Sequence, residues 1–267
     1  MRAISSRQNP LVQQFRDAAG PSAGARDLIL LDGPHLVATA LDLGLAVPVA
    51  GVLEAELEDP EFAELARRLE ASGTDVAAVT NSVMDAMSPV RTPSGIVALT
   101  RLAPAEAGSL LTRPDALLLV AADIQDPGNL GGLVRSAEAA GATGVIASGL
   151  STSPLSWKTL RGSMGSALRL PVASALDTEA LVGEARLAGL QIVAAVPRGG
   201  LAPEAIDWAR PTALFLGGEG PGLPHAVVEA SDVRVTIPMA PPVESLNVGI
   251  AGALLLYAAR RHRQGGR

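Results

Sequence analysis

The sequence contains no cysteine, and aromatic residues make up only 2% of its 267 positions. The absence of cysteine excludes disulfides, zinc sites with cysteine ligands and a thiolate nucleophile. Because aromatics are scarce, the hydrophobic cores must be built from Ala, Val, Leu and Ile. The hydrophobic share of 48% is typical of a globular protein.

Other absences narrow the possible functions further. The net charge of −6 argues against a protein that coats nucleic acid non-specifically. The three histidines, His35, His225 and His262, lack the spacing of metal ligands, so we expect no metal. The longest apolar stretches, 116–122 and 250–259, are too short or too interrupted to span a bilayer. We therefore expect a cytoplasmic protein that has no membrane contact.

The chain divides into two halves. Prolines and a glycine interrupt any regular pattern across residues 104–114, which predicts a linker between domains at 1–103 and 115–267. In the first half, apolar runs and helical spacing alternate and predict a small α/β domain. Its expected strands are 28–31, 49–53, 76–79 and 96–99, and its expected helices are 35–43 and 61–71.

In the second half, the alternation of apolar runs and helical stretches is stronger. Buried apolar strands that alternate with helices are typical of a parallel sheet covered on both faces. Ligands of such folds bind at the carboxyl ends of the strands. The expected strands are 116–122, 144–147, 191–196, 213–216 and 233–237, and the expected helices are 130–140, 178–188 and 246–261.

The first segment with chemical potential is 123–135, which reads DIQDPGNLGGLVR. It follows an apolar run, turns at Pro127 and Gly128, and enters a helix that Asn129 is suited to cap. Taken alone, it is best read as a capped strand–turn–helix joint with a surface Arg135. The glycines do not fit the dinucleotide-binding pattern G-x-G-x-x-G.

The second segment is 214–224, LFLGGEGPGLP, in which glycines directly follow a strand. Such a loop lets the backbone approach a ligand closely. The acidic Glu219 and the lack of a P-loop lysine argue against phosphate binding. In isolation, a purely structural turn remains an equal alternative.

The third segment is 237–249, IPMAPPVESLNVG, which leaves the last strand, passes three prolines and enters a helix. Ser245 is suited to cap that helix, and Asn247 would then lie in a solvated first turn. Helical spacing places four apolar side chains on one face, which pack either internally or against a partner. These are Leu246, Ile250, Leu254 and Tyr257.

In combination and in this order, the three segments resemble the SpoU-TrmH family of RNA 2′-O-ribose methyltransferases. The resemblance covers most of residues 115–261. The first half resembles the family's L30e-like substrate-binding domain, through residues 30–34 (LLDGP) and 94–98 (SGIVA). Asp32 stands there in place of the more common glutamate.

The resemblance implies a C-terminal α/β domain with a deep trefoil knot and S-adenosylmethionine bound in it. It implies that Arg135, Asn129, Glu219, Ser245 and Asn247 are the catalytic and site-organising polar residues. Arg135 is the family's proposed catalytic residue, but arginine is effectively always protonated, so a phosphate clamp is physically easier than a general base. The implied cofactor-binding residues are Leu216, Gly217, Gly218, Ile237, Met239 and Leu246.

The resemblance also implies a homodimer, formed through the knot domain with help from the final helix. Structured RNA is the implied substrate, and the L30e-like domain favours rRNA over tRNA. Two alternatives remain open, namely a non-catalytic RNA-binding or ribosome-associated module that kept the fold, and an unrelated nucleotide-dependent enzyme. Lys158, Arg161 and Arg169 lie in a stretch expected to be loop, where RNA contact and ordinary exposure are equally plausible.

Overall fold

The structure, a computed structural model, describes residues 1–20 and 28–265. The chain forms two units, each with its own sheet and core. One consists of Met1–Ala103 together with Leu155–Leu168, and the other of Pro104–Pro154 together with the described chain from Arg169 onward. The sequence contains no sign that the short second segment would fold with the first half.

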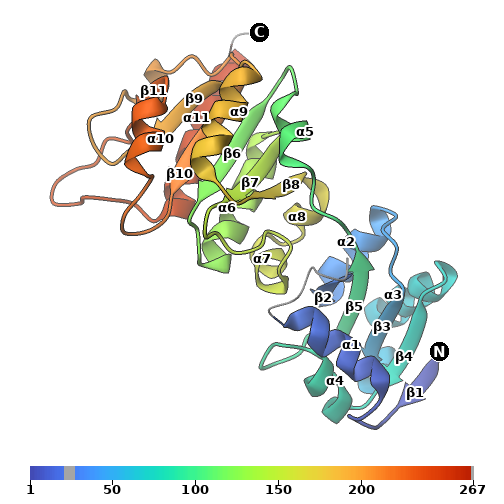
Figure 1. Cartoon of the computed structure of the whole chain (residues 1–267). Helices are drawn as coiled ribbons and strands as arrows, with labels where there is room; N and C mark the ends of the chain where they lie inside the picture. Colours follow the sequence, from blue (N-terminus) through green and yellow to red (C-terminus); the bar gives the residue numbers. More distant parts are fainter. Residues whose placement is uncertain (21–27, 266–267) are drawn as a thin grey trace. The chain divides into compact units, whose positions relative to one another are not determined.

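The N-terminal unit has a five-stranded mixed sheet in the order β1-β4-β3-β5-β2, in which β5 runs antiparallel to both neighbours. Helices α1 and α4 pack together, as do α2 and α3, and Figure 1 shows the two pairs on opposite faces of the sheet. The strands are β1 (Arg2–Ile4), β2 (Leu28–Asp32), β3 (Val49–Leu53), β4 (Asp75–Val79) and β5 (Ile96–Arg101). The helices are α1 (Pro10–Ala19), α2 (Pro34–Asp42), η1 (Glu54–Glu58), α3 (Pro60–Ala71), α4 (Asn81–Met87) and α7 (Trp157–Gly162).

The core of this unit lies under α1 and α4. Phe15, Met84 and Leu99 are fully buried there, and Trp157 of α7 packs against the same cluster from outside. The four strands and two helices expected in this half are present, with ends shifted by up to two residues. The expected α/β class is therefore confirmed.

The C-terminal unit has a six-stranded sheet in the order β11-β9-β10-β6-β7-β8, and all its paired strands are parallel. Its strands are β6 (Leu117–Ala122), β7 (Gly144–Ser148), β8 (Val172–Ala175), β9 (Gln191–Ala195), β10 (Thr212–Gly217) and β11 (Val233–Val235). Its helices are α5 (Ala107–Leu111), α6 (Pro127–Ala140), α9 (Thr178–Leu187), η2 (Pro203–Ala205), α10 (His225–Ala230) and α11 (Val248–Gly265). Helix α8 (Ser166–Arg169) lies where the chain returns to this unit.

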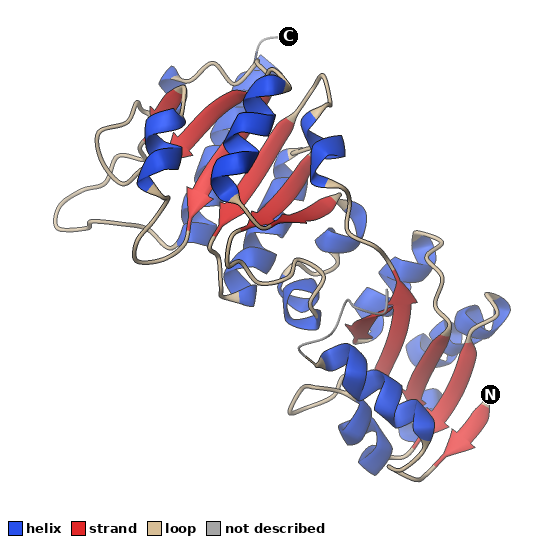
Figure 2. Cartoon of the chain, viewed as in Figure 1, coloured by secondary structure: helices blue, strands red, loops and turns tan. Residues whose placement is uncertain are grey.

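Helices cover both faces of this sheet, as the nearly continuous apolar strands predict (Figure 2). Helices α5, α9 and α10 supply the core on one face, where Phe215 of β10 is buried. The next residue, Leu216, points to the other face, where α6 and α11 pack against each other. The parallel α/β fold expected for this half is confirmed.

A glycine fixes the distance between α6 and α11. A Cβ on Gly252 of α11 would overlap the side chains of Leu133 on α6 and Leu216 on β10. The helix therefore lies directly on both of these side chains. Since Leu216 ends a strand at the ligand-binding edge of the sheet, this packing positions the start of α11 beside that edge.

Candidate functional site

A pocket of about 400 Å³ opens at the carboxyl ends of β9, β10 and β11 and is closed by the start of α11. Its volume is in the range of small-molecule sites. Its wall is mostly apolar, with backbone and a few polar side chains between. The lining residues are Ala195, Val196, Pro197, Leu216, Gly217, Glu219, Gly220, Gly222, Val235, Ile237, Met239, Ser245, Leu246, Asn247, Val248, Ala251 and Leu255.

The glycine loop after β10 folds back on itself to form one wall. Gly218 and Gly222 pair across the loop, and Gly220 and Gly222 have φ angles of 99° and 70°, which favour glycine. A Cβ on Gly217 would overlap the backbone of Gly222 and Leu223. The loop therefore needs a bare backbone at Gly217 to close.

Gly218 differs from its neighbours. It is not in the pocket lining, and a Cβ there would overlap the carbonyl of Asp123, which directly follows the neighbouring strand β6. Asp123 itself has a φ of 58°, which is uncommon for a residue with a side chain. Gly218 therefore brings the glycine loop against the segment that leads to α6.

One side chain from each of the three sequence segments meets at the pocket. The Asn129 amide nitrogen donates to Glu219 Oε1 at 3.0 Å, and Asn247 Nδ2 donates to the same oxygen at 3.0 Å. Asn247 Nδ2 also lies 3.0 Å from Asn129 Oδ1, which accepts from it. We call these three residues the amide–carboxylate cluster.

The helix caps differ from the sequence expectation. Asp126, not Asn129, caps α6, because its carboxylate accepts from the Asn129 backbone N–H at 2.7 Å. Asn247, not Ser245, caps α11, because its Oδ1 accepts from the N–H groups of Gly249 and Ile250 at 2.9 and 3.3 Å. The Asn129 side chain is thereby left to join the amide–carboxylate cluster, and Ser245 lies in the pocket lining.

Arg135 lies on α6, the helix that carries Asn129 near its start. Its side chain is exposed, and no hydrogen bond or ion pair of the described residues involves its guanidinium. It does not line the pocket. Its donors are thus available to a phosphate or carboxylate from outside.

The expected cofactor residues Leu216, Gly217, Ile237, Met239 and Leu246 all lie in the pocket lining. Sequence reasoning missed the wall formed by residues 195–197 after β9 and by Val248, Ala251 and Leu255 of α11. A signal existed for the first group, because 191–196 was an expected strand and parallel strands end at one edge. At α11 the sequence pattern drew attention to a different face, Leu246, Ile250, Leu254 and Tyr257, and gave no signal for Val248, Ala251 and Leu255.

A model described as the SpoU rRNA Methylase family matches residues 116–257, which is more than half of the chain. The chain belongs to the SpoU rRNA methylase family. Its similarity to known proteins extends over both units. It is 36% identical over 98% of its length to an uncharacterized tRNA/rRNA methyltransferase of Synechocystis sp., of which it covers 94%.

Two further relatives of this SpoU family member carry more specific descriptions. One is the 23S rRNA (guanosine(2553)-2′-O)-methyltransferase RlmP of Bacillus subtilis, 29% identical over 97% of the chain and all of that protein. The other is the AdoMet-bound rRNA methyltransferase of Sinorhizobium meliloti, whose crystal structure superposes with a TM-score of 0.85 at 30% identity over 98% of both chains. The fold expected from the resemblance is confirmed as that of the SpoU methyltransferases.

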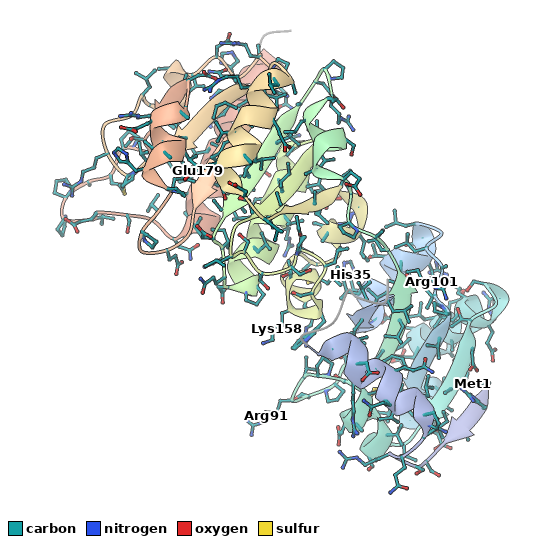
Figure 3. All side chains as sticks on the ribbon, in the orientation of Figure 1. Met1, His35, Arg91, Arg101, Lys158 and Glu179 are labelled. Carbon is teal, nitrogen blue, oxygen red and sulfur yellow. The ribbon has the colours of Figure 1, made fainter. Side chains whose placement is uncertain are left out.

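The basic stretch of this SpoU family member is helical, which corrects the expectation of a loop. Arg161 of α7 has its guanidinium 3.7 Å from the buried carboxylate of Asp32. Lys158, which is labelled in Figure 3, has its ammonium 5.4 Å from the centre of the Trp157 ring on the same helix. Arg169 forms a two-pronged bond to Glu138 at 2.6 and 2.9 Å. Arg161 and Arg169 therefore already have carboxylate partners.

Asp32 is the buried acid of the N-terminal unit. Burial raises the pKa of Asp32 above its ordinary value, against the opposing effects of the Ser88 hydroxyl, 2.5 Å away, and of Arg161. Its Oδ1 accepts no hydrogen bond. Asp32, which replaces the more common glutamate, therefore loses solvation on burial, and this costs folding free energy when it is charged.

Two kinds of feature are absent from the part of the chain that the structure describes. No group of three or more His, Asp or Glu side chains in that part of the chain could hold a metal ion. No helix of residues 1–20 and 28–265 is long and apolar enough to cross a membrane.

Proposed function

We propose that this chain transfers a methyl group from S-adenosylmethionine to a ribose 2′-hydroxyl of structured RNA, with rRNA as the target. The amide–carboxylate cluster carries the proposal, because it joins one polar residue of each family segment at the mouth of an apolar pocket. A non-catalytic descendant of the family would have no need to keep this set intact.

The residues of the pocket fit S-adenosylmethionine. Leu216, Ile237 and Met239 provide apolar walls for a flat base, and the bare backbone of Gly217 allows close approach. When bound, S-adenosylmethionine supplies a methyl group activated by the positive charge on its sulfur. We assign these residues, with Leu246, to cofactor binding. Gly218 acts indirectly by placing the loop.

Arg135 is proposed to hold the RNA rather than to remove the hydroxyl proton. A guanidinium stays protonated in proteins, so it is a poor base. It presents several donors in one plane, which suits a phosphate next to the reacting ribose. Orientation of this kind brings the 2′-oxygen into line with the methyl group and is a large part of such catalysis.

The choice of rRNA follows from relatives that span both units. RlmP and the Sinorhizobium meliloti protein match the chain over 97% and 98% of its length, and both are named for rRNA. We propose that the N-terminal unit binds the RNA substrate and that its functional extent includes Leu155–Leu168 as well as residues 1–103. We place the domain boundary near residue 103 instead of a linker at 104–114, because α5 in that stretch packs in the core of the C-terminal unit.

A homodimer formed through α11 is also proposed. Three apolar side chains on one face of this helix, Ile250, Leu254 and Tyr257, are about half exposed, at 55%, 49% and 48%. An exposed apolar stripe of this kind is typical of a surface that another chain covers. The knot stays a prediction. Two observations support it, namely the loop at 217–222, which folds back on itself, and the close packing of α11 on Leu133 and Leu216. The proposed reaction belongs in the cytoplasm, where rRNA is accessible.

Calorimetry with S-adenosylmethionine and, separately, NAD tests the cofactor assignment. We expect saturable binding of S-adenosylmethionine and none of NAD. Binding of NAD alone would favour the unrelated nucleotide-dependent enzyme. Transfer of labelled methyl from S-adenosylmethionine to purified rRNA, but not to rRNA already methylated at the same ribose, tests the reaction.

A further inference from the structure

Glu219 is the single ionisable side chain among the described residues that line the pocket. The other lining side chains are apolar, or are the neutral Ser245 and Asn247. Glu219 is exposed, so water weakens its field, but no other charged side chain of the lining opposes it. The pocket therefore has a negative potential from one source.

The position of this charge is fixed. Glu219 Oε1 accepts two hydrogen bonds, from Asn129 and from Asn247, each 3.0 Å long. Asn247 is itself held by capping α11, and Asn129 is anchored in the first turn of α6. The carboxylate is thus tied to two helices and cannot turn away from the pocket without breaking both bonds.

The two forms of the methyl donor differ by one charge. S-adenosylmethionine carries a positive sulfur, whereas the product left after transfer, S-adenosylhomocysteine, has a neutral thioether at the same place. The ammonium and carboxylate of the amino-acid part are the same in both. Because both forms carry the ammonium, a fixed negative charge in the pocket wall gives the donor an additional attraction, to its sulfonium, that the product lacks.

We propose that Glu219 distinguishes the charged methyl donor from its neutral product, and so promotes product release after each transfer. This inference rests on the proposed function and assigns Glu219 a role in distinguishing the two ligands. The geometry agrees, since the partners of Glu219 are Asn129 and Asn247 and no bond joins it to Arg135.

Calorimetry with both compounds on wild-type protein and on Glu219→Gln tests the proposal. Glutamine keeps an acceptor oxygen for both asparagines and removes only the charge. We expect the ratio of the two dissociation constants, product over donor, to fall by about 1.4-fold to fivefold, the range for one exposed charge contact. The change should come from weaker binding of the donor.

Glu244→Gln is the matched control. Glu244 precedes Ser245 but lies outside the lining and pairs with Arg198 at 3.2 Å, both side chains being exposed. Removing its charge should leave the ratio unchanged. Added salt should lower the ratio in wild-type protein and have less effect in Glu219→Gln.

The outcomes separate the two proposals. An equal loss of affinity for both compounds in Glu219→Gln would show that Glu219 reads the shared ammonium or only supports the fold, and would overturn the inference. An unchanged ratio would overturn it too. Wild-type protein that binds neither compound would overturn the proposed function itself.

Discussion

Asn247 Nδ2 lies 3.0 Å from Asn129 Oδ1, although 118 positions separate the two residues in the chain. The bond links the starts of α11 and α6, and both residues also bond to Glu219. Through these bonds the segments 123–135, 214–224 and 237–249 contact one another at a single site.

Asn129→Ala should lower the free energy of unfolding by about 1 kcal/mol, the usual net value of a hydrogen bond. Asn247→Ala should lower it by about 1–2 kcal/mol more, because it also removes the cap of α11. The double variant should lose less than the sum, because the two residues share bonds, with a coupling of about 0.5 kcal/mol or more. Urea unfolding measures all three. Asn129→Ala with Ser245→Ala is the control pair and should be additive.

Arg135→Ala should reduce methyl transfer to rRNA by about a hundredfold, which is the order of effect expected from losing substrate orientation. Because Arg135 lies outside the pocket lining, the affinity for S-adenosylmethionine should stay within about twofold. Arg135→Lys should be intermediate, since lysine keeps the charge but not the planar donors. Undiminished transfer by Arg135→Ala would refute the role assigned to it.

Gly252→Ala should destabilise the protein by about 1–3 kcal/mol, because the new methyl group would overlap Leu133 and Leu216 in a filled core. Gly183→Ala on α9 is the matched control. A Cβ there meets nothing within 4 Å, so the change should stabilise by about 0.5–1 kcal/mol through lower chain entropy. If Gly252→Ala were as stabilising as Gly183→Ala, the space beside Gly252 would not be filled as described.

Asp32 should make stability depend on pH. Burial raises the pKa of Asp32 in the folded state. The stability that protonated Asp32 contributes is therefore fully present below its ordinary pKa and is lost as pH rises through the pKa of the folded state. As pH rises from acid to neutral, the wild type should therefore lose stability relative to Asp32→Asn. Arg161→Gln removes the nearby cation, so its stability should depend on pH more steeply than that of the wild type. Urea midpoints of the three proteins at several pH values test this, and parallel curves would contradict it.

The sequence predicts the second half of the fold well because its parallel strands are buried on both faces. Runs such as 116–122 are continuously apolar and unlike any surface segment. Strand β8 (Val172–Ala175) has four residues with one exposed serine, which is too short to stand out. Helix α7 was missed because Gly162, Ser163 and Gly165 suggest loop, whereas its Trp157 packs on a core far away in sequence.

The candidate site was foreseen as a set of residues but not as a set of contacts. Asp126 and Asn129, like Ser245 and Asn247, belong to the same class of helix-capping side chains. Only the backbone decides which member of each pair caps. At α6 the Asp126 cap leaves the Asn129 side chain free for Glu219, whereas Asn247 caps α11 through Oδ1 and donates to Glu219 through Nδ2. Contacts between residues this far apart depend on the sheet order, which periodicity does not encode.

The central claim is that this chain methylates a ribose of rRNA. Mapping 2′-O-methylation across rRNA and tRNA, in cells with the gene deleted and in cells that express wild-type or Arg135→Ala protein, tests it most directly. We predict that one rRNA ribose loses its methyl group on deletion and regains it with the wild-type protein but not with Arg135→Ala. An rRNA pattern that does not change on deletion, or a change confined to tRNA, would contradict the claim.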